Sequence, residues 1–96
     1  MEEIMSKVDE ILKNRDSIHG NYQKVAETAQ HLKGVIAEGE NHLPLDMNES
    51  LDLICTKIAR IANGNYNEID HWLDIAGYAQ LISNKLQKDL SENSNR

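Results

Sequence analysis

The sequence predicts an all-α protein, a small four-helix bundle that assembles into an oligomer. Apolar residues recur at the spacing of amphipathic helices in four separate segments. Turn-rich connectors separate these segments, and no stretch alternates with the period of a strand. With 96 residues, the chain buries a modest fraction of its surface, so association with further copies is expected to add stability.

The first two helices are predicted from their apolar stripes. One runs from Glu2 to about Lys13, and the other from near Asn21 to about Ala37. The stripes comprise Ile4, Met5, Val8, Ile11 and Leu12 in the first helix, and Val25, Ala29, Leu32, Val35 and Ile36 in the second. Residues 14–21 are rich in turn formers, which predicts a connector that offers binding groups.

The third helix is predicted to begin at Asp46, which forms a capping box with Glu49. Its buried side is Leu51, Ile54, Ile58, Ile61 and Ala62, and it ends at residues 63–65. The fourth helix runs from about Asn67 to about Leu90. Residues 1–90 thus form a single helical domain, and residues 91–96 are expected to be a disordered tail.

The fourth helix is apolar on almost every side, which is typical of a buried helix. These apolar residues are Ile69, Trp72, Leu73, Ile75, Ala76, Ala79, Ile82 and Leu86. Asp70 and Asp74 nevertheless share one face, one turn apart. Buried carboxylates need a basic side chain, a helix end or a metal as partner. Gly77, one turn further, predicts the close approach of another helix or a ligand.

Composition limits the compartment and the partners. The formal net charge of −6 disfavours general nucleic-acid binding, but it allows a nucleotide in a local basic pocket. No apolar stretch has membrane-spanning length and no signal peptide is recognised, so a cytoplasmic protein without membrane contact is expected. The single Cys55 excludes an internal disulfide and is expected to be a buried structural thiol.

Four carboxylates form the strongest candidate site, namely Glu49 and Asp52 on the third helix and Asp70 and Asp74 on the fourth. Each pair lies within about one helical turn, and helices joined by a short turn usually pack antiparallel, so the two pairs can face each other. Such carboxylates can hold one or two Mg²⁺ ions together with substrate phosphates. The sequence therefore predicts a Mg²⁺ site formed by these four residues.

Basic and aromatic side chains complete the candidate site. Lys57 and Arg60 can meet phosphate oxygens, and His19 and Tyr78 are assigned with them to ligand binding. In the structural alternative, Asp70 and Asp74 pair with Lys57 and Arg60, Glu49 caps its helix and Asp52 is solvated. None of the four histidines has the spacing of a zinc site, and His71, beside Trp72, is expected to be a packed or rim residue rather than a base.

Several segments resemble a family of small phage and prophage proteins of unassigned function. They are His-Gly-Asn-Tyr at 19–22, Ala-Gln-His-Leu-Lys at 29–33, Glu-Ser-Leu-Asp at 49–52, Lys-Ile-Ala-Arg-Ile at 57–61 and Asp-His-Trp-Leu-Asp-Ile-Ala-Gly-Tyr-Ala at 70–79. The resemblance extends over residues 15–86 and is most specific over 57–78. It implies a phage protein in the cytoplasm of a bacterial host cell and does not imply an activity.

More distantly, the sequence is similar to the all-α MazG-like nucleoside triphosphate pyrophosphohydrolases. Those enzymes bind Mg²⁺ through Glu-x-x-Glu on one helix and Glu-x-x-Asp on the next. The counterparts here are Glu49-x-x-Asp52 and Asp70-x-x-x-Asp74, so the second spacing is four rather than three and Asp replaces Glu. This resemblance implies a dimer or tetramer with a site between helices.

Three functions follow from these observations. The first is nucleotide or phosphate handling, with Mg²⁺-dependent NTP pyrophosphohydrolysis as its enzymatic form. The second is a non-catalytic, oligomeric phage accessory protein for counter-defence, which binds or sequesters a nucleotide signal or a host protein. The third is a purely structural helical interaction protein. Whether the protein is an enzyme stays open at this point.

Overall fold

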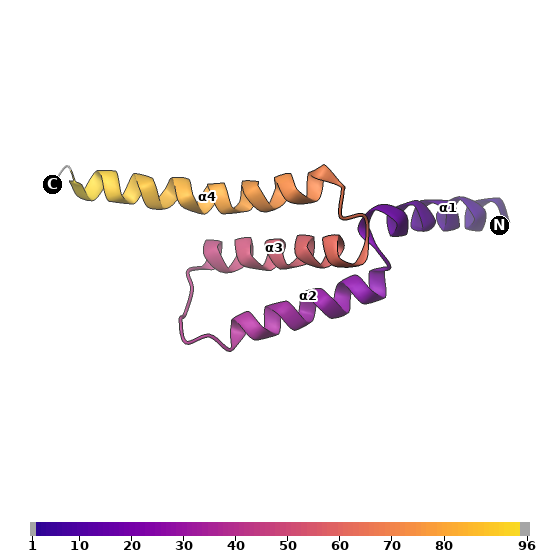
Figure 1. Ribbon diagram of the computed structural model, residues 1–96, viewed down its shortest axis with the longest axis horizontal. Helices are drawn as coiled ribbons and strands as arrows, with labels where there is room; N and C mark the ends of the chain where they lie inside the picture. Colours follow the sequence, from indigo (N-terminus) through magenta and orange to yellow (C-terminus); the bar gives the residue numbers. More distant parts are fainter. Residues whose placement is uncertain (1, 95–96) are drawn as a thin grey trace.

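The computed structural model describes the backbone of residues 2–94 and the side chains of residues 7–93. This part of the chain forms four helices and no strand, which confirms the all-α prediction. The helices are α1 (Glu2–His19), α2 (Tyr22–Ala37), α3 (Leu45–Asn63) and α4 (Ile69–Ser94) (Figure 1). None of the helices in these residues has the length and apolar character needed to cross a membrane.

Helix α3 is the centre of the fold. It packs against α2 on one side and against α4 on the other, and α2 and α4 do not contact each other in the described residues (Figure 1). Helix α1 extends away from one end of this group, and α4 extends beyond the other end. The radius of gyration is 17.8 Å, compared with about 12 Å for a compact domain of this length.

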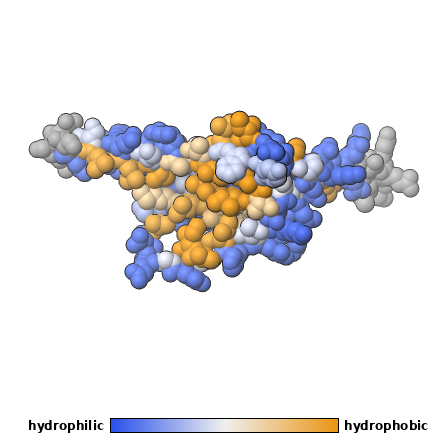
Figure 2. All heavy atoms as spheres, viewed as in Figure 1, coloured by the Kyte–Doolittle hydropathy of each residue, from blue (hydrophilic) through white to orange (hydrophobic). Residues whose placement is uncertain are grey.

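The core within one chain is small. It is built from Val25, Ala29 and Ala59, and the prediction of a buried Cys55 is confirmed. Alanines at this contact allow α2 and α3 to approach closely, but they bury little apolar area. Figure 2 shows that hydrophobic surface remains over α2, α3 and α4 on the face in view.

The prediction that the fourth helix is buried is wrong for the single chain. On α4, Trp72 is 54% exposed, Leu73 57% and Leu81 64%. The reason is that α4 has one neighbouring helix, α3, so most of its circumference faces solvent. A helix that is apolar on several sides and covered on one is unusual for a monomeric protein.

The predicted end of the first helix at Lys13 is also wrong, because α1 continues through most of the predicted connector to His19. Ser17 Oγ donates to the Asn14 carbonyl at 2.8 Å, which satisfies a turn-forming side chain within the helix. The helix ends at Gly20, whose φ of +90° is open to glycine but strained for other residues. The Gly20 amide donates to Asp16 O at 2.9 Å.

The predicted capping box at the start of the third helix is absent. Pro44 occupies the N-cap position without a side-chain hydrogen bond, and Glu49 is exposed. Asp46 instead pairs with Lys85 of α4 at 2.6 Å. Helix α4 runs to Ser94, past the residue at which the tail is predicted to begin, and residues 95–96 lie outside the described chain.

The ends of α1 and α3 are joined at a junction, which comprises residues 18–20, residues 63–65 and His71. The Asn65 amide donates to Ile18 O at 3.1 Å. Asn63 Nδ2 donates to Thr28 Oγ1 at 3.0 Å and to Ala59 O at 2.9 Å, which ties the end of α3 to α2. These bonds place the end of α1 beside the last turn of α3.

Candidate functional site

The four predicted metal ligands do not come together within one chain. Glu49 and Asp70 are exposed, and Asp52 is partly exposed on α3. The described residues contain no group of three or more His, Cys, Asp or Glu side chains that could hold a metal ion. The donors as placed in a single chain therefore do not fit a Mg²⁺ site, and Mg²⁺ binding stays a prediction.

Asp74 has a different partner. Its Oδ2 lies 2.9 Å from Lys57 Nζ, and the side-chain exposure is 44% for Asp74 and 14% for Lys57. The hydrogen bond from Lys57 lowers the pKa of Asp74. This contact is the ion pair that the structural alternative predicts for these two residues, and it engages Lys57 on the α4 side of α3.

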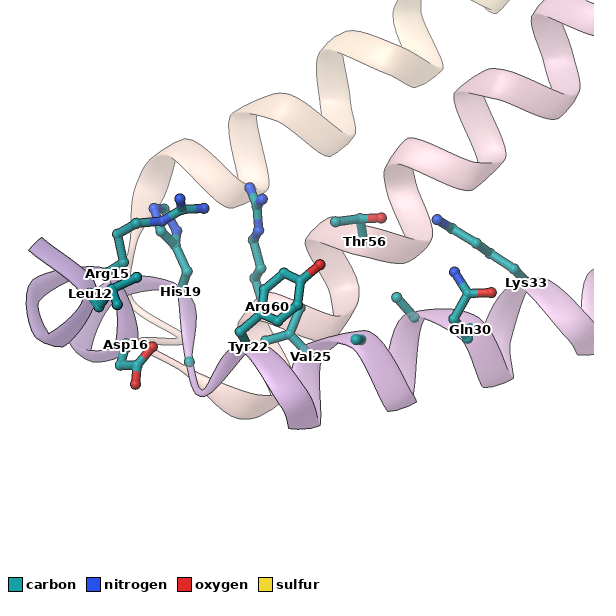
Figure 3. Close-up of a pocket in the computed structure, with 13 residues that line it drawn as sticks. Leu12, Arg15, Asp16, His19, Tyr22, Val25, Gln30, Lys33, Thr56 and Arg60 are labelled. Carbon is teal, nitrogen blue, oxygen red and sulfur yellow. The ribbon is translucent and has the colours of Figure 1, made fainter. Parts of the chain in front are cut away.

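Arg60 and His19 do share a cavity. It has a volume of about 270 Å³ and lies where α1, α2 and α3 meet. We call it the basic cavity, because three cationic side chains line it, Arg15 from α1, Lys33 from α2 and Arg60 from α3 (Figure 3). Asp16 is the only carboxylate among its lining residues. Positive charge is thus concentrated here in a chain whose net charge is −6.

The rest of the basic cavity is apolar or hydrogen-bonding. Helix α2 supplies a wall of helically spaced residues, with Tyr22 at one end and Gln30 towards the other (Figure 3). Small side chains between them leave the space open. The lining residues besides the charged ones are Leu12, His19, Gly20, Tyr22, Val25, Ala26, Ala29, Gln30 and Thr56. Tyr22 is 78% exposed, so one face of its ring is accessible to a ligand.

His19, which lines the basic cavity, contacts a second histidine, His71 of α4. His71 is 1% exposed, which confirms that it is packed. Its Nε2 lies 3.3 Å from His19 Nδ1 and 3.4 Å from Ile18 O. Because a carbonyl accepts only, we assign the proton of this pair to His71 Nε2. A neutral His19 then carries its own proton on Nε2, where it can donate to an anion in the cavity. His71 Nδ1 is buried without a hydrogen-bond partner.

Burial and neighbouring positive charge lower the pKa of His19 below its usual 6.5. Partial burial has the largest effect, followed by Arg60, His71, Arg15 and Lys57. His19 is therefore uncharged over a wider pH range in the folded chain than in the unfolded chain.

A pH prediction follows from His19. Below its unfolded-state pKa of about 6.5, the unfolded chain binds more protons than the folded chain, so folding stability is full above this pH and falls as the pH decreases. We expect the melting temperature to fall between about pH 7.5 and about pH 5.5. The fall should be smaller in His19→Gln and unchanged in His42→Gln, which alters an exposed loop histidine. An identical pH dependence in wild type and His19→Gln would contradict this assignment.

Tyr78 lies in a second depression, away from the basic cavity. This depression, of about 260 Å³, is the α3/α4 groove. It is lined by Leu43, Met47, Ser50, Leu51, Ile54, Tyr78, Ala79 and Ile82. Since α2 and α4 lie on opposite sides of α3, a residue of this groove cannot reach the basic cavity. The structure therefore does not bring Tyr78 together with Arg60 and His19.

Sequence reasoning missed Arg15, Lys33 and Tyr22. Arg15 falls in the predicted connector, but on a continuous helix it lies one turn before His19 on the same face. Tyr22, Ala26, Ala29 and Lys33 follow each other at helical spacing along α2. Polar and small residues at that spacing are the signal that could have revealed the wall of the basic cavity.

No family model, curated protein or solved structure matches this chain. The geometry of the two depressions and the distribution of charge therefore carry the functional argument.

Proposed function

We propose that this protein binds a small phosphate-bearing ligand of the nucleotide class in the basic cavity. The observation that supports this most directly is that Arg15, Lys33 and Arg60, from three helices, all line one cavity, with Arg15 and Lys33 towards opposite ends (Figure 3). Guanidinium groups match phosphate oxygens in charge and in geometry. His19 adds a hydrogen-bond donor at the same end of the cavity as Arg15 (Figure 3).

The remaining lining suits the uncharged part of a nucleotide. A nucleobase can stack on an exposed aromatic ring such as Tyr22. Gln30 and Thr56 offer amide and hydroxyl groups for hydrogen bonds to a base or a sugar. The volume of about 270 Å³ is close to the lower end of small-molecule sites, about 300 Å³, which favours one mononucleotide.

The binding form of this function is better supported than the hydrolytic form. The distant resemblance to MazG-like pyrophosphohydrolases supports a nucleotide ligand, whereas the resemblance to phage proteins implies no ligand. Hydrolysis by that family also needs a cluster of acids for Mg²⁺, whereas the basic cavity has one carboxylate, Asp16. The predicted ligands Glu49 and Asp70 are exposed elsewhere. The geometry therefore favours a protein that binds or sequesters its ligand.

Calorimetric titration tests the proposal, with a nucleoside, its monophosphate and its triphosphate as probes. We expect the phosphorylated probes to bind and the nucleoside to bind far more weakly. Arg60→Gln should weaken binding by about 10–100-fold, because a charge-assisted hydrogen bond contributes about 1.5–3 kcal/mol. Lys88→Gln on α4 is the matched control, since it removes one exposed cation outside the cavity.

Two results would contradict this function, namely equal affinity for nucleoside and nucleotide, or equal loss of affinity in Arg60→Gln and Lys88→Gln. Repeating the titration with Mg²⁺ and with a chelator distinguishes nucleotide binding from nucleotide hydrolysis. Pyrophosphate released from the triphosphate only with Mg²⁺ supports the enzyme. Intact nucleotide in both conditions supports the binder.

We further propose that the protein self-associates. The accessible surface of one chain is 7734 Å², compared with about 5,600 Å² for a compact monomer of 10.9 kDa. The difference is more than twice the roughly 800 Å² that each partner buries in a stable interface. Large exposed side chains such as Leu81 and Trp72 supply apolar area for such an interface.

A further inference from the structure

Helix α1 has an apolar face that its own chain leaves uncovered. Val8 is 48% exposed and Ile11 59%, and the two residues lie one turn apart on the same side. The N-terminal half of α1 projects into solvent beyond α2 and α3 (Figure 1). A single helix of this length is marginally stable in water, so a second surface over this face would stabilise it considerably.

The α3/α4 groove offers a surface of the matching kind. It lies near the start of α3, bordered by Met47 and Ile54, and near the middle of α4, at Ile82. None of its lining residues is charged. An open apolar groove between two helices is a typical receptor for the apolar face of a third helix, which inserts residues spaced three and four apart.

We propose that α1 of one chain docks through Val8 and Ile11 in the α3/α4 groove of a second copy, which docks its own α1 in return. This interface is a specific form of the self-association proposed above and depends on it. Helix α1 leaves the molecule at the Asn63 end of α3, whereas the groove lies at the Leu45 end. A two-fold axis between antiparallel copies therefore brings both helices to both grooves and closes the dimer.

Part of the excess surface of the single chain lies on the apolar face of α1 and in the α3/α4 groove. Each copy contributes one helix face and one groove, so every dimer contains the contact twice. Val8 and Ile11 of the helix face are about half-exposed in the single chain, and the residues that line the groove are partly exposed apart from the buried Ser50 and the exposed Ala79. A partner of a different sequence would leave one of the two patches open, whereas a second copy covers both.

Docking of α1 also bears on the basic cavity. Arg15 and His19 reach the cavity from α1, which its own chain holds only near the junction. A second copy that holds the N-terminal half of α1 therefore fixes the orientation of these two side chains. Phosphate-ligand affinity should accordingly decrease on dilution below the dimer dissociation constant.

Disulfide trapping tests the interface. Full-length Val8→Cys and Ile82→Cys chains are mixed, unfolded and refolded together to exchange subunits, and then oxidised. We expect a cross-link between positions 8 and 82 of different chains. Asp9→Cys replaces Val8→Cys in the matched control, because position 9 lies on another side of α1. The native Cys55 is 3% exposed and does not compete.

Sedimentation velocity provides the second measurement. The wild-type chain should sediment as a dimer, and Ile11→Asp should weaken dimerisation by at least about tenfold, because the groove would desolvate the new carboxylate. Asp9→Asn should remain dimeric. Far-UV circular dichroism verifies that Ile11→Asp keeps its helices, as expected for a position outside the α2–α4 packing.

The outcomes separate this interface from self-association in general. A wild-type monomer at high micromolar concentration overturns both proposals. A dimer that survives Ile11→Asp, or that gives no cross-link between positions 8 and 82, overturns only the docking of α1 in the groove. Efficient cross-linking of Val8→Cys with itself also overturns it, since the α1 helices would then pair with each other.

Discussion

Replacing Gly20 by alanine should destabilise the protein by roughly 3 kcal/mol or more and lower its melting temperature by about 12 °C or more. Gly20 has a φ of +90°, which strains any residue with a Cβ. An added Cβ would also lie 2.6 Å from the carbonyl carbon of Asn63, so two backbone segments would have to separate. Thermal unfolding followed by far-UV circular dichroism measures the effect.

Gly34→Ala is the matched control for this variant. Among the described residues, no heavy atom outside the backbone of α2 itself lies within 4 Å of the position that a Cβ would take at Gly34, in the last turn of α2. Alanine should therefore raise stability there by about 0.5–1 kcal/mol through its higher helix propensity. A Gly20→Ala protein that melts together with wild type would contradict the close backbone contact at the junction.

Truncating His71 to alanine should cost roughly 2–4 kcal/mol. This side chain is 1% exposed, and its removal leaves a cavity between α4 and the end of α1. It also loses the polar contacts with His19 Nδ1 and Ile18 O. The melting temperature reports the change, and His42→Ala, in an exposed loop, should leave it unaltered.

His71→Phe separates packing from hydrogen bonding at this position. Phenylalanine refills the volume and removes the buried Nδ1 that lacks a partner. We expect it to recover most of the stability while leaving His19 without its neighbouring donor, so that nucleotide affinity is lower than in wild type. Wild-type stability in His71→Ala would show that the junction does not depend on this residue.

The sequence predicts the helices well because their signal is local. Apolar spacing identifies all four segments, and the end of α2 agrees with the prediction. The end of α1 is misjudged because residues 14–17 combine turn-forming side chains. Their preference for a turn yields to helical hydrogen bonds such as that from Ser17 to Asn14 O. The error conceals Arg15, whose position on the helix brings it beside His19.

The site is predicted only in part because it depends on which side of α3 each residue faces. Arg60 lines the basic cavity with His19, and its charge also helps to lower the pKa of Asp74 on α4. Lys57 engages Asp74 of α4. Tyr78 is on α4 as well, so it shares the groove of that side. Spacing along the sequence does not reveal which neighbouring helix lies on which side of α3.

Gly77 is a second case in which the sequence does not reveal the neighbours of a helix. Glycine within a helix suggests a close neighbour, yet among the described residues no heavy atom outside the backbone of α4 itself lies within 4 Å of the position that a Cβ would take there. The helical spacing of the apolar residues predicts α4 correctly. The presence of apolar residues on most sides of this helix does not predict how many helices of the same chain cover it. In the described residues, α3 is the only helix whose backbone packs against α4, and the end of α1 contacts it at His71.

The central position of α3 has a consequence for folding during synthesis. Helices α1 and α2 emerge from the ribosome first, but they contact each other only near the turn at residues 20–21. Helix α2 cannot bury Val25 and Ala29 until α3 has been translated, and short isolated helices are unstable. The first half of the chain is therefore expected to remain largely unfolded until α3 has been synthesised. Once α3 is present, the short connections to both neighbours make folding a sequence of local steps, which proceed quickly.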